Sequence, residues 1–132
     1  MGILDLDEGV VLESVKPLIF VMSDARGETA NVVVMAAAAQ FGPDSVDIVR
    51  LHDAKDLATV EKFLDENVRP DRPMAVFHTF SDKNMRREVR GLLESRGIPS
   101  IDLLGPAISV IATLSGEEPN NKVGALRDQL AK

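Results

Sequence analysis

Short apolar runs alternate with segments of helical length along this chain. Runs of strand length, either continuous or alternating, fall at residues 18–22, 45–51, 74–79 and 98–104. Apolar spacing and helix-length stretches predict helices at residues 28–41, 56–68, 84–96 and 106–114. Four such alternations are typical of βαβ units with right-handed crossovers. We therefore expect a three-layer α/β/α domain with a four-stranded parallel sheet in the order 2-1-3-4.

The same pattern divides the chain into three parts. Residues 1–16 are acidic with one apolar patch and are interpreted as an N-terminal extension. Residues 17–115 hold the predicted strands and helices and form the α/β domain. Residues 116–132 hold a polar linker, followed by apolar positions that predict a short final helix.

The first strand and helix enclose a polar turn, residues 23–27, that contains Gly27. A strand, a glycine turn and a helix in succession leave backbone N–H groups and a helix N-terminus facing one space, which favours an anion. Ser23 and Thr29 add hydroxyl donors, and Arg26 adds a cation. In the alternative interpretation, Gly27 only permits a left-handed turn, and Ser23 or Asp24 caps the helix.

The expected strand order brings this turn close to the end of the third strand. The order is flavodoxin-like without the last strand, and in such sheets the ligand crevice lies beyond the carboxyl ends of strands one and three. We therefore expect one anion or ligand site where these loops meet, bordered by the fourth strand and the third helix. Its candidate residues are Ser23, Asp24, Arg26, Gly27, Glu28, Thr29, His78, Thr79, Arg86, Asp102 and Gly105.

The first predicted helix lacks a polar face. Residues 30–39 are apolar nearly all the way round, whereas a surface helix normally carries polar residues on one side. We expect this helix to be covered by the N-terminal extension, by a second copy in a homodimer, or by a neighbouring domain.

The composition and charge of the chain argue against several classes of function. A net charge of −6 and a pI near 4.9 argue against a general binder of nucleic acid or of anionic membranes. No apolar run reaches the length of a membrane span, and the start lacks the basic residues of a signal peptide. The chain has no cysteine and no histidine pair spaced for a metal, so we predict a cytoplasmic domain without a metal site.

Several motifs together resemble one protein family. They are the turn and helix start at residues 23–30, the pair Gln40-Phe41, the strand end at residues 79–81 with an arginine at 86 or 87, and Ile-Pro-Ser-Ile-Asp-Leu-Leu-Gly-Pro at residues 98–106. In this combination the chain resembles the N-terminal part of the regulatory proteins of pyruvate, phosphate dikinase and phosphoenolpyruvate synthase. The resemblance implies a parent protein that is both an ADP-dependent Ser/Thr kinase and a phosphate-dependent, pyrophosphate-forming phosphorylase. It also implies ADP and phosphate as ligands of the parent, with a C-terminal kinase domain or the client enzyme as partner.

Two departures from the family pattern limit what the resemblance implies. Ala25 and Arg26 stand where relatives carry small hydroxyl residues, so this turn has a cation in place of a neutral donor. The sequence also has no Gly-Lys-Ser/Thr segment of the kind that holds nucleotide phosphates and Mg²⁺. We therefore expect a regulatory or binding domain with no catalytic residues and no cofactor of its own.

Two other functions fit parts of the sequence. Ser23, Gly27 and Thr29 have nearly the spacing of a flavodoxin phosphate loop, although no Trp or Tyr is present to stack on a flavin. A stand-alone enzyme is the other alternative, because histidines and aspartates near the predicted strand ends are able to pair for acid–base work. Those residues are His52, His78, Asp24, Asp53 and Asp82.

Overall fold

Strands and helices alternate along residues 15–130, the part of the chain that the computed structural model describes. The strands are β1 (Leu18–Ser23), β2 (Asp47–Leu51), β3 (Met74–Thr79) and β4 (Ser100–Asp102). The helices are α1 (Glu28–Ala38), α2 (Leu57–Asn67), α3 (Lys83–Ser95), α4 (Gly105–Ser115) and α5 (Ala125–Leu130). Nearly all of the predicted N-terminal extension lies outside the described residues.

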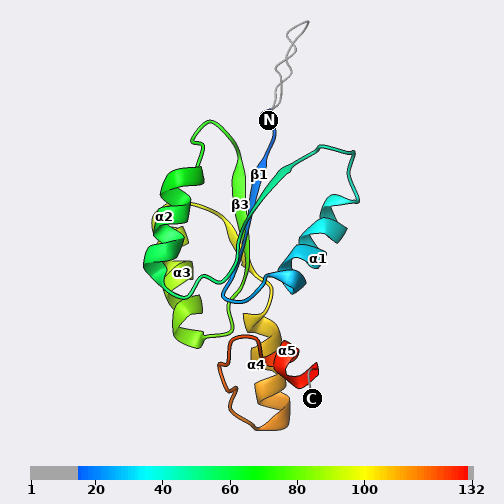
Figure 1. Cartoon of the computed structure of the whole chain (residues 1–132), viewed down its shortest axis with the longest axis vertical. Coiled ribbons are helices and arrows are strands. Elements are labelled where there is room, and N and C mark those ends of the chain that lie inside the picture. The colour runs from blue at the N-terminus through cyan, green and yellow to red at the C-terminus, as the bar shows by residue number, and fades with distance from the viewer. Residues whose placement is uncertain (1–14, 131–132) are drawn as a thin grey trace, which may run out of the picture.

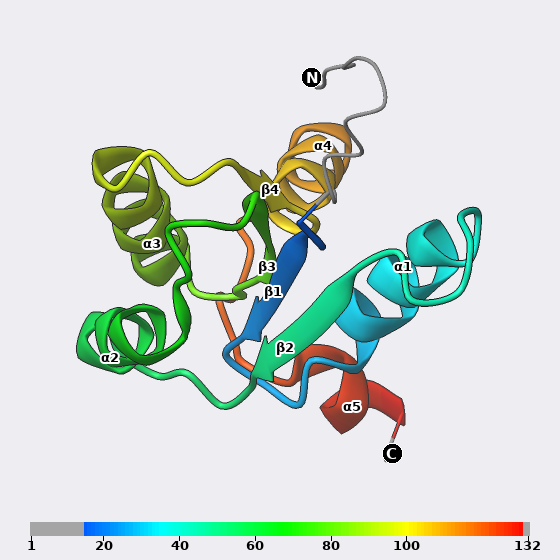
Figure 2. The ribbon, with the colours of Figure 1, turned by 90° about the horizontal axis from the view of Figure 1, so that it is seen from above.

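The four strands form one parallel sheet in the order β2-β1-β3-β4, as predicted. In the pairing of β1 with β3, Leu18 lies opposite Met74 and Ser23 lies opposite Thr79. Helices α2 and α3 cover one face of the sheet and α1 covers the other, while α4 and α5 lie beyond the carboxyl ends of the strands (Figures 1 and 2). The predicted α/β class and strand order are therefore confirmed.

The two faces of the sheet differ in how much core they bury. Because strand residues alternate between faces, Phe20, Met22 and Val76 point toward α2 and α3, where the larger hydrophobic cluster lies. Val21 belongs to a smaller cluster under α1, together with Ala30 and Val34. Most of the buried apolar side chains therefore lie between the sheet and helices α2 and α3.

Two helices start with the side-chain caps that their sequences favour. Asp56 accepts a hydrogen bond from the Thr59 N–H at 2.9 Å, and Asp82 accepts one from the Met85 N–H at 2.9 Å. Helix α1 differs, because its N-cap is Gly27 with φ +78° and no side chain caps its first N–H groups. The start of α1 is therefore available for an external acceptor.

Two elements are at least three residues shorter than the sequence predicts. Strand β4 spans only Ser100–Asp102, because Ile98 packs into the core and the Asp102 side chain turns to accept from the Leu104 N–H at 2.9 Å. Helix α1 ends at Ala38, and residues 40 and 41 then bond three residues back in a tighter turn before Gly42.

The outward face of α1 remains uncovered by the described residues. Only Ala30 and Val34 of this helix are buried, whereas Val32 is 66% exposed and Met35 is 51% exposed. Within residues 15–130, no helix is long and apolar enough to cross a membrane.

Candidate functional site

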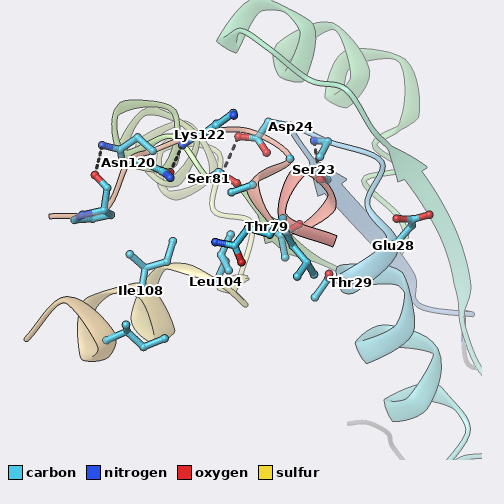
Figure 3. A pocket seen from close by; sticks show the side chains of 18 of the residues that line it. Ser23, Asp24, Glu28, Thr29, Thr79, Ser81, Leu104, Ile108, Asn120 and Lys122 are labelled. Atoms are coloured by element: carbon cyan, nitrogen blue, oxygen red, sulfur yellow. Dashed lines mark hydrogen bonds between the residues drawn. The ribbon is translucent and has the colours of Figure 1, made fainter. Parts of the chain in front are cut away.

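A cavity of about 720 Å³ lies at the carboxyl edge of the sheet. One wall is formed by the β1–α1 turn, by Thr79 at the end of β3 and by Ser81 just after it, as Figure 3 shows. The opposite wall is formed by α4, the loop at residues 117–122 and α5. The cavity therefore lies where strands β1 and β3 end side by side.

The β1–α1 turn presents backbone donors at this cavity. The Ala25 N–H donates to Ser23 Oγ at 3.0 Å, which closes the turn, and Gly27 then adopts φ +78°. Glu28 and Thr29, the first residues of α1, line the cavity. Their N–H groups have no intrahelical acceptor and no side-chain cap, so they remain available for an anion.

The loop after β2 fixes the position of this turn. The Ala54 N–H donates to the Ser23 carbonyl at 3.0 Å, and the Asp53 N–H donates to the Ala25 carbonyl at 2.8 Å. Lys55 Nζ donates to the Asp24 carbonyl at 2.6 Å. We did not predict a role for Lys55 from the sequence, although β2 pairs with β1 and therefore places its following loop at the same edge.

Asp24 joins the β1–α1 turn to the β3–α3 loop. Its side chain is almost fully buried, and Oδ2 accepts from the Ser81 N–H at 2.8 Å and from the Asp82 N–H at 3.4 Å. The other oxygen, Oδ1, has no partner within the described part of the chain. Burial raises the pKa of Asp24, while the N–H groups of Ser81 and Asp82 and the charge of Lys55 oppose that rise.

The structure brings seven of the eleven candidate residues into the cavity wall. They are Ser23, Asp24, Arg26, Gly27, Glu28, Thr29 and Thr79. The other four, His78, Arg86, Asp102 and Gly105, are not among the residues that line the cavity.

His78 is separated from the cavity by the alternation of β3. It shares a face with Val76, and its ring centroid lies 5.7 Å from that of Phe80 in the larger core. It is 1% exposed, and Nδ1 has no hydrogen-bond partner among residues 15–130. Burial lowers the pKa of His78, Asp102 opposes this effect, and the charges of Arg90 and Arg86 add to it.

Arg86, Asp102 and Gly105 form a bracket behind the cavity. Arg86 Nη1 donates to the carbonyls of Phe80 and Ser81, each at 3.0 Å, and Nε lies 3.9 Å from Asp102 Oδ2. Asp102 Oδ1 accepts from the N–H groups of Leu104 and Gly105 at the start of α4. These residues therefore hold the β3–α3 loop and α4 in place.

The far wall of the cavity was missed by reasoning from the sequence. It includes Ile108 and Ala112 of α4, Leu126 of α5 and residues 117–122, which we had interpreted as a linker. A possible signal was the apolar character of α4 directly after a strand's carboxyl end. The cavity thus combines the polar β1–α1 turn on one wall with a partly apolar surface on the other.

Acid–base and metal chemistry have little support in this arrangement. His52 Nδ1 lies 2.9 Å from Asp53 Oδ2, but both side chains are more than half exposed and neither lines the cavity. Among residues 15–130, no group of three His, Asp or Glu side chains is placed to hold a metal ion.

The chain is similar to regulatory proteins that are longer than it is. The kinase/pyrophosphorylase family model matches residues 19–132. A protein assigned as a pyruvate, phosphate dikinase regulatory protein in Bdellovibrio bacteriovorus is 32% identical over 109 residues, which cover 83% of this chain and 38% of that protein. Similarly assigned proteins of Lactiplantibacillus plantarum and Listeria welshimeri are 29% identical over 108 residues and 31% identical over 112 residues. These alignments cover 82% and 85% of this chain but only 39% and 40% of the two proteins. The chain therefore belongs to the kinase/pyrophosphorylase family.

Proposed function

We propose that this chain is the N-terminal, anion-binding domain of a bifunctional regulatory protein. Its client is pyruvate, phosphate dikinase or phosphoenolpyruvate synthase, which the parent phosphorylates with ADP and dephosphorylates with phosphate to form pyrophosphate. The family assignment and the relatives' names support the dikinase client. In this proposal the domain works in the cytoplasm, which agrees with the absence of cysteine.

The observation that carries the anion site is the uncapped start of α1 inside a cavity. Gly27 has φ +78° and precedes Glu28 and Thr29, which have no side-chain cap on their N–H groups and line the cavity together with Thr79. The positive end of the helix dipole favours an anion there, and Arg26 is available to pair with it.

The domain binds and regulates rather than transferring phosphate. The sequence lacks a Gly-Lys-Ser/Thr phosphate loop, so in this proposal a C-terminal kinase domain supplies the residues that hold ADP. The exposed apolar face of α1 supplies a contact surface for that domain or for a second copy.

Amide chemical shifts test the anion site directly. We expect phosphate, pyrophosphate or ADP to shift the amide resonances of residues 23–29. Gly27→Ala should abolish the shifts, because φ +78° strains any side chain at that position. Gly97→Ala is the matched control, since Gly97 has φ +69° and does not line the cavity. Shifts confined to other regions, or no shifts at all, would remove the site.

Flavin mononucleotide binding is the second candidate, and the cavity's size and apolar far wall favour it. The chain has no Trp or Tyr to stack on the isoalloxazine ring, which is the reason we rank it below the first. Protein purified in the presence of flavin and then desalted should be colourless. Retained absorbance in the visible range would reverse the order of the two candidates.

A further inference from the structure

We propose that the β1–α1 turn selects an oxyanion that carries its own proton, such as hydrogen phosphate, and that Asp24 is the residue that selects it. The inference rests on the proposed anion site and specifies its ligand chemistry. Asp24 Oδ1 would accept the hydrogen bond from the anion's O–H group, while the N–H groups of Glu28 and Thr29 donate to its other oxygens.

The support from Asp24 is independent of the helix N-terminus. The residue is 2% exposed and lines the same cavity, as Figure 3 shows. Its Oδ2 is already used by the Ser81 and Asp82 N–H groups, whereas Oδ1 has no partner within residues 15–130. A buried carboxylate oxygen without a partner carries a desolvation cost, and a bound donor in the cavity would remove that cost.

The selection follows from the direction of the hydrogen bond, since a carboxylate oxygen only accepts and the anion must donate. A carboxylate beside the anion repels a fully deprotonated oxyanion, but it accepts a hydrogen bond from an oxyanion that keeps a proton. Inorganic phosphate retains a proton at neutral and mildly alkaline pH, whereas sulfate has none. The two ions have nearly the same shape and size, so backbone N–H donors alone would hold them about equally.

The cationic groups near Asp24 do not distinguish these anions by their proton. Lys55 contacts the Asp24 carbonyl, and Arg26 lies on the adjoining turn. The other acidic groups in the cavity wall are Glu28, Glu117 and Glu118, with Lys122 also in that wall, while the Asp82 carboxylate caps α3. The three glutamate carboxylates are exposed to solvent, which screens their charge and satisfies their oxygens, so the buried Asp24 Oδ1 provides most of the discrimination.

Titration of the whole chain with three matched anions tests the inference. At about pH 8 and constant ionic strength, we expect phosphate to shift the amides of residues 23–29. Sulfate and monofluorophosphate, which lack a proton, should bind about ten- to hundredfold more weakly. Asp24→Asn should raise the affinity for sulfate and remove most of the preference, because an amide N–H donates where the carboxylate accepts.

The outcomes separate this inference from the proposed function. If the unaltered protein binds phosphate, sulfate and monofluorophosphate equally at residues 23–29, the anion site stands and the role of Asp24 is wrong. If none of the three anions shifts these amides, both the anion site and the selection are wrong. The fluorinated anion keeps the test decisive even if Asp24→Asn does not fold.

Discussion

The absence of a side chain at Gly105 allows Asp102 and Arg86 to pack closely against the start of α4. A Cβ at this position would overlap Asp102 Oδ2 and lie 3.1 Å from Arg86 Nε. We expect Gly105→Ala to destabilise the protein by about 1–3 kcal/mol, because the Asp102 carboxylate cannot move without losing its bonds to the start of α4. Urea unfolding measures this change.

Gly91 provides the matched control for Gly105. It lies in the interior of α3, and a Cβ there would meet nothing within 4 Å. Gly91→Ala should leave stability unchanged or raise it by up to about 1 kcal/mol, since alanine is the better helix former. Equal stability changes in the two variants would contradict the proposed bracket.

His78 should make stability depend on pH. Burial keeps its pKa below the ordinary value of 6.5, so the folded protein binds fewer protons at this site than the unfolded chain. The stability that a neutral His78 provides is therefore present above about pH 6.5 and is lost as the pH falls. His78→Gln should lose less stability than the unaltered protein between about pH 7.5 and about pH 5.5, as measured by urea unfolding. Parallel pH profiles would show that His78 does not titrate in this way.

At the scale of elements, the start of α3 connects a helix cap to the cavity. Asp82 accepts from the Met85 N–H at 2.9 Å, and its own N–H points to Asp24. We expect Asp82→Ala to cost about 1 kcal/mol through loss of the cap, while Asp82→Asn should retain most of that stability because asparagine caps equally well. Thermal unfolding followed by circular dichroism distinguishes them, and an equal loss in both variants would point to charge rather than capping.

The elements themselves were largely predictable from the sequence. Local periodicity marked every strand and helix up to α4, because apolar spacing reports which side of an element is buried. The ends were harder to predict, since β4 stops where Asp102 turns to cap α4 and sequence spacing does not encode that choice. The short α5 was expected as well.

The candidate site was predictable only where neighbouring strands determine it. Ser23 and Thr79 meet because β1 and β3 pair, and the expected strand order already implied that pairing. His78 lies on the other face from Thr79, and alternation alone does not say which face will hold a cavity. The wall from α4 to α5 depends on a long-range return of the chain, which no local pattern reports.

At the scale of the whole molecule, exposed apolar residues gather on helices α1 and α4, and two more, Leu126 and Leu130, lie on α5. On α1, Val32 is 66% exposed and Met35 is 51% exposed, and Val110, Ile111 and Leu114 of α4 are also exposed. Relatives carry more than half of their length outside the region matched here. An apolar helix face that is exposed to solvent is a candidate surface for association with another protein or domain. We expect α1 to contribute most of that surface, because only Ala30 and Val34 of this helix are buried against the sheet.

We therefore expect the isolated chain to self-associate through α1. Replacing Val32 and Met35 together with glutamate should shift the protein toward the monomer in sedimentation velocity at matched concentrations. The unfolding midpoint should change little, since neither side chain is buried. Lys62→Glu, on the exposed surface of α2, alters the net charge by the same amount and should leave association unchanged. A wild-type protein that is monomeric at high concentration would contradict this and leave the N-terminal extension or another domain as the cover of the α1 face.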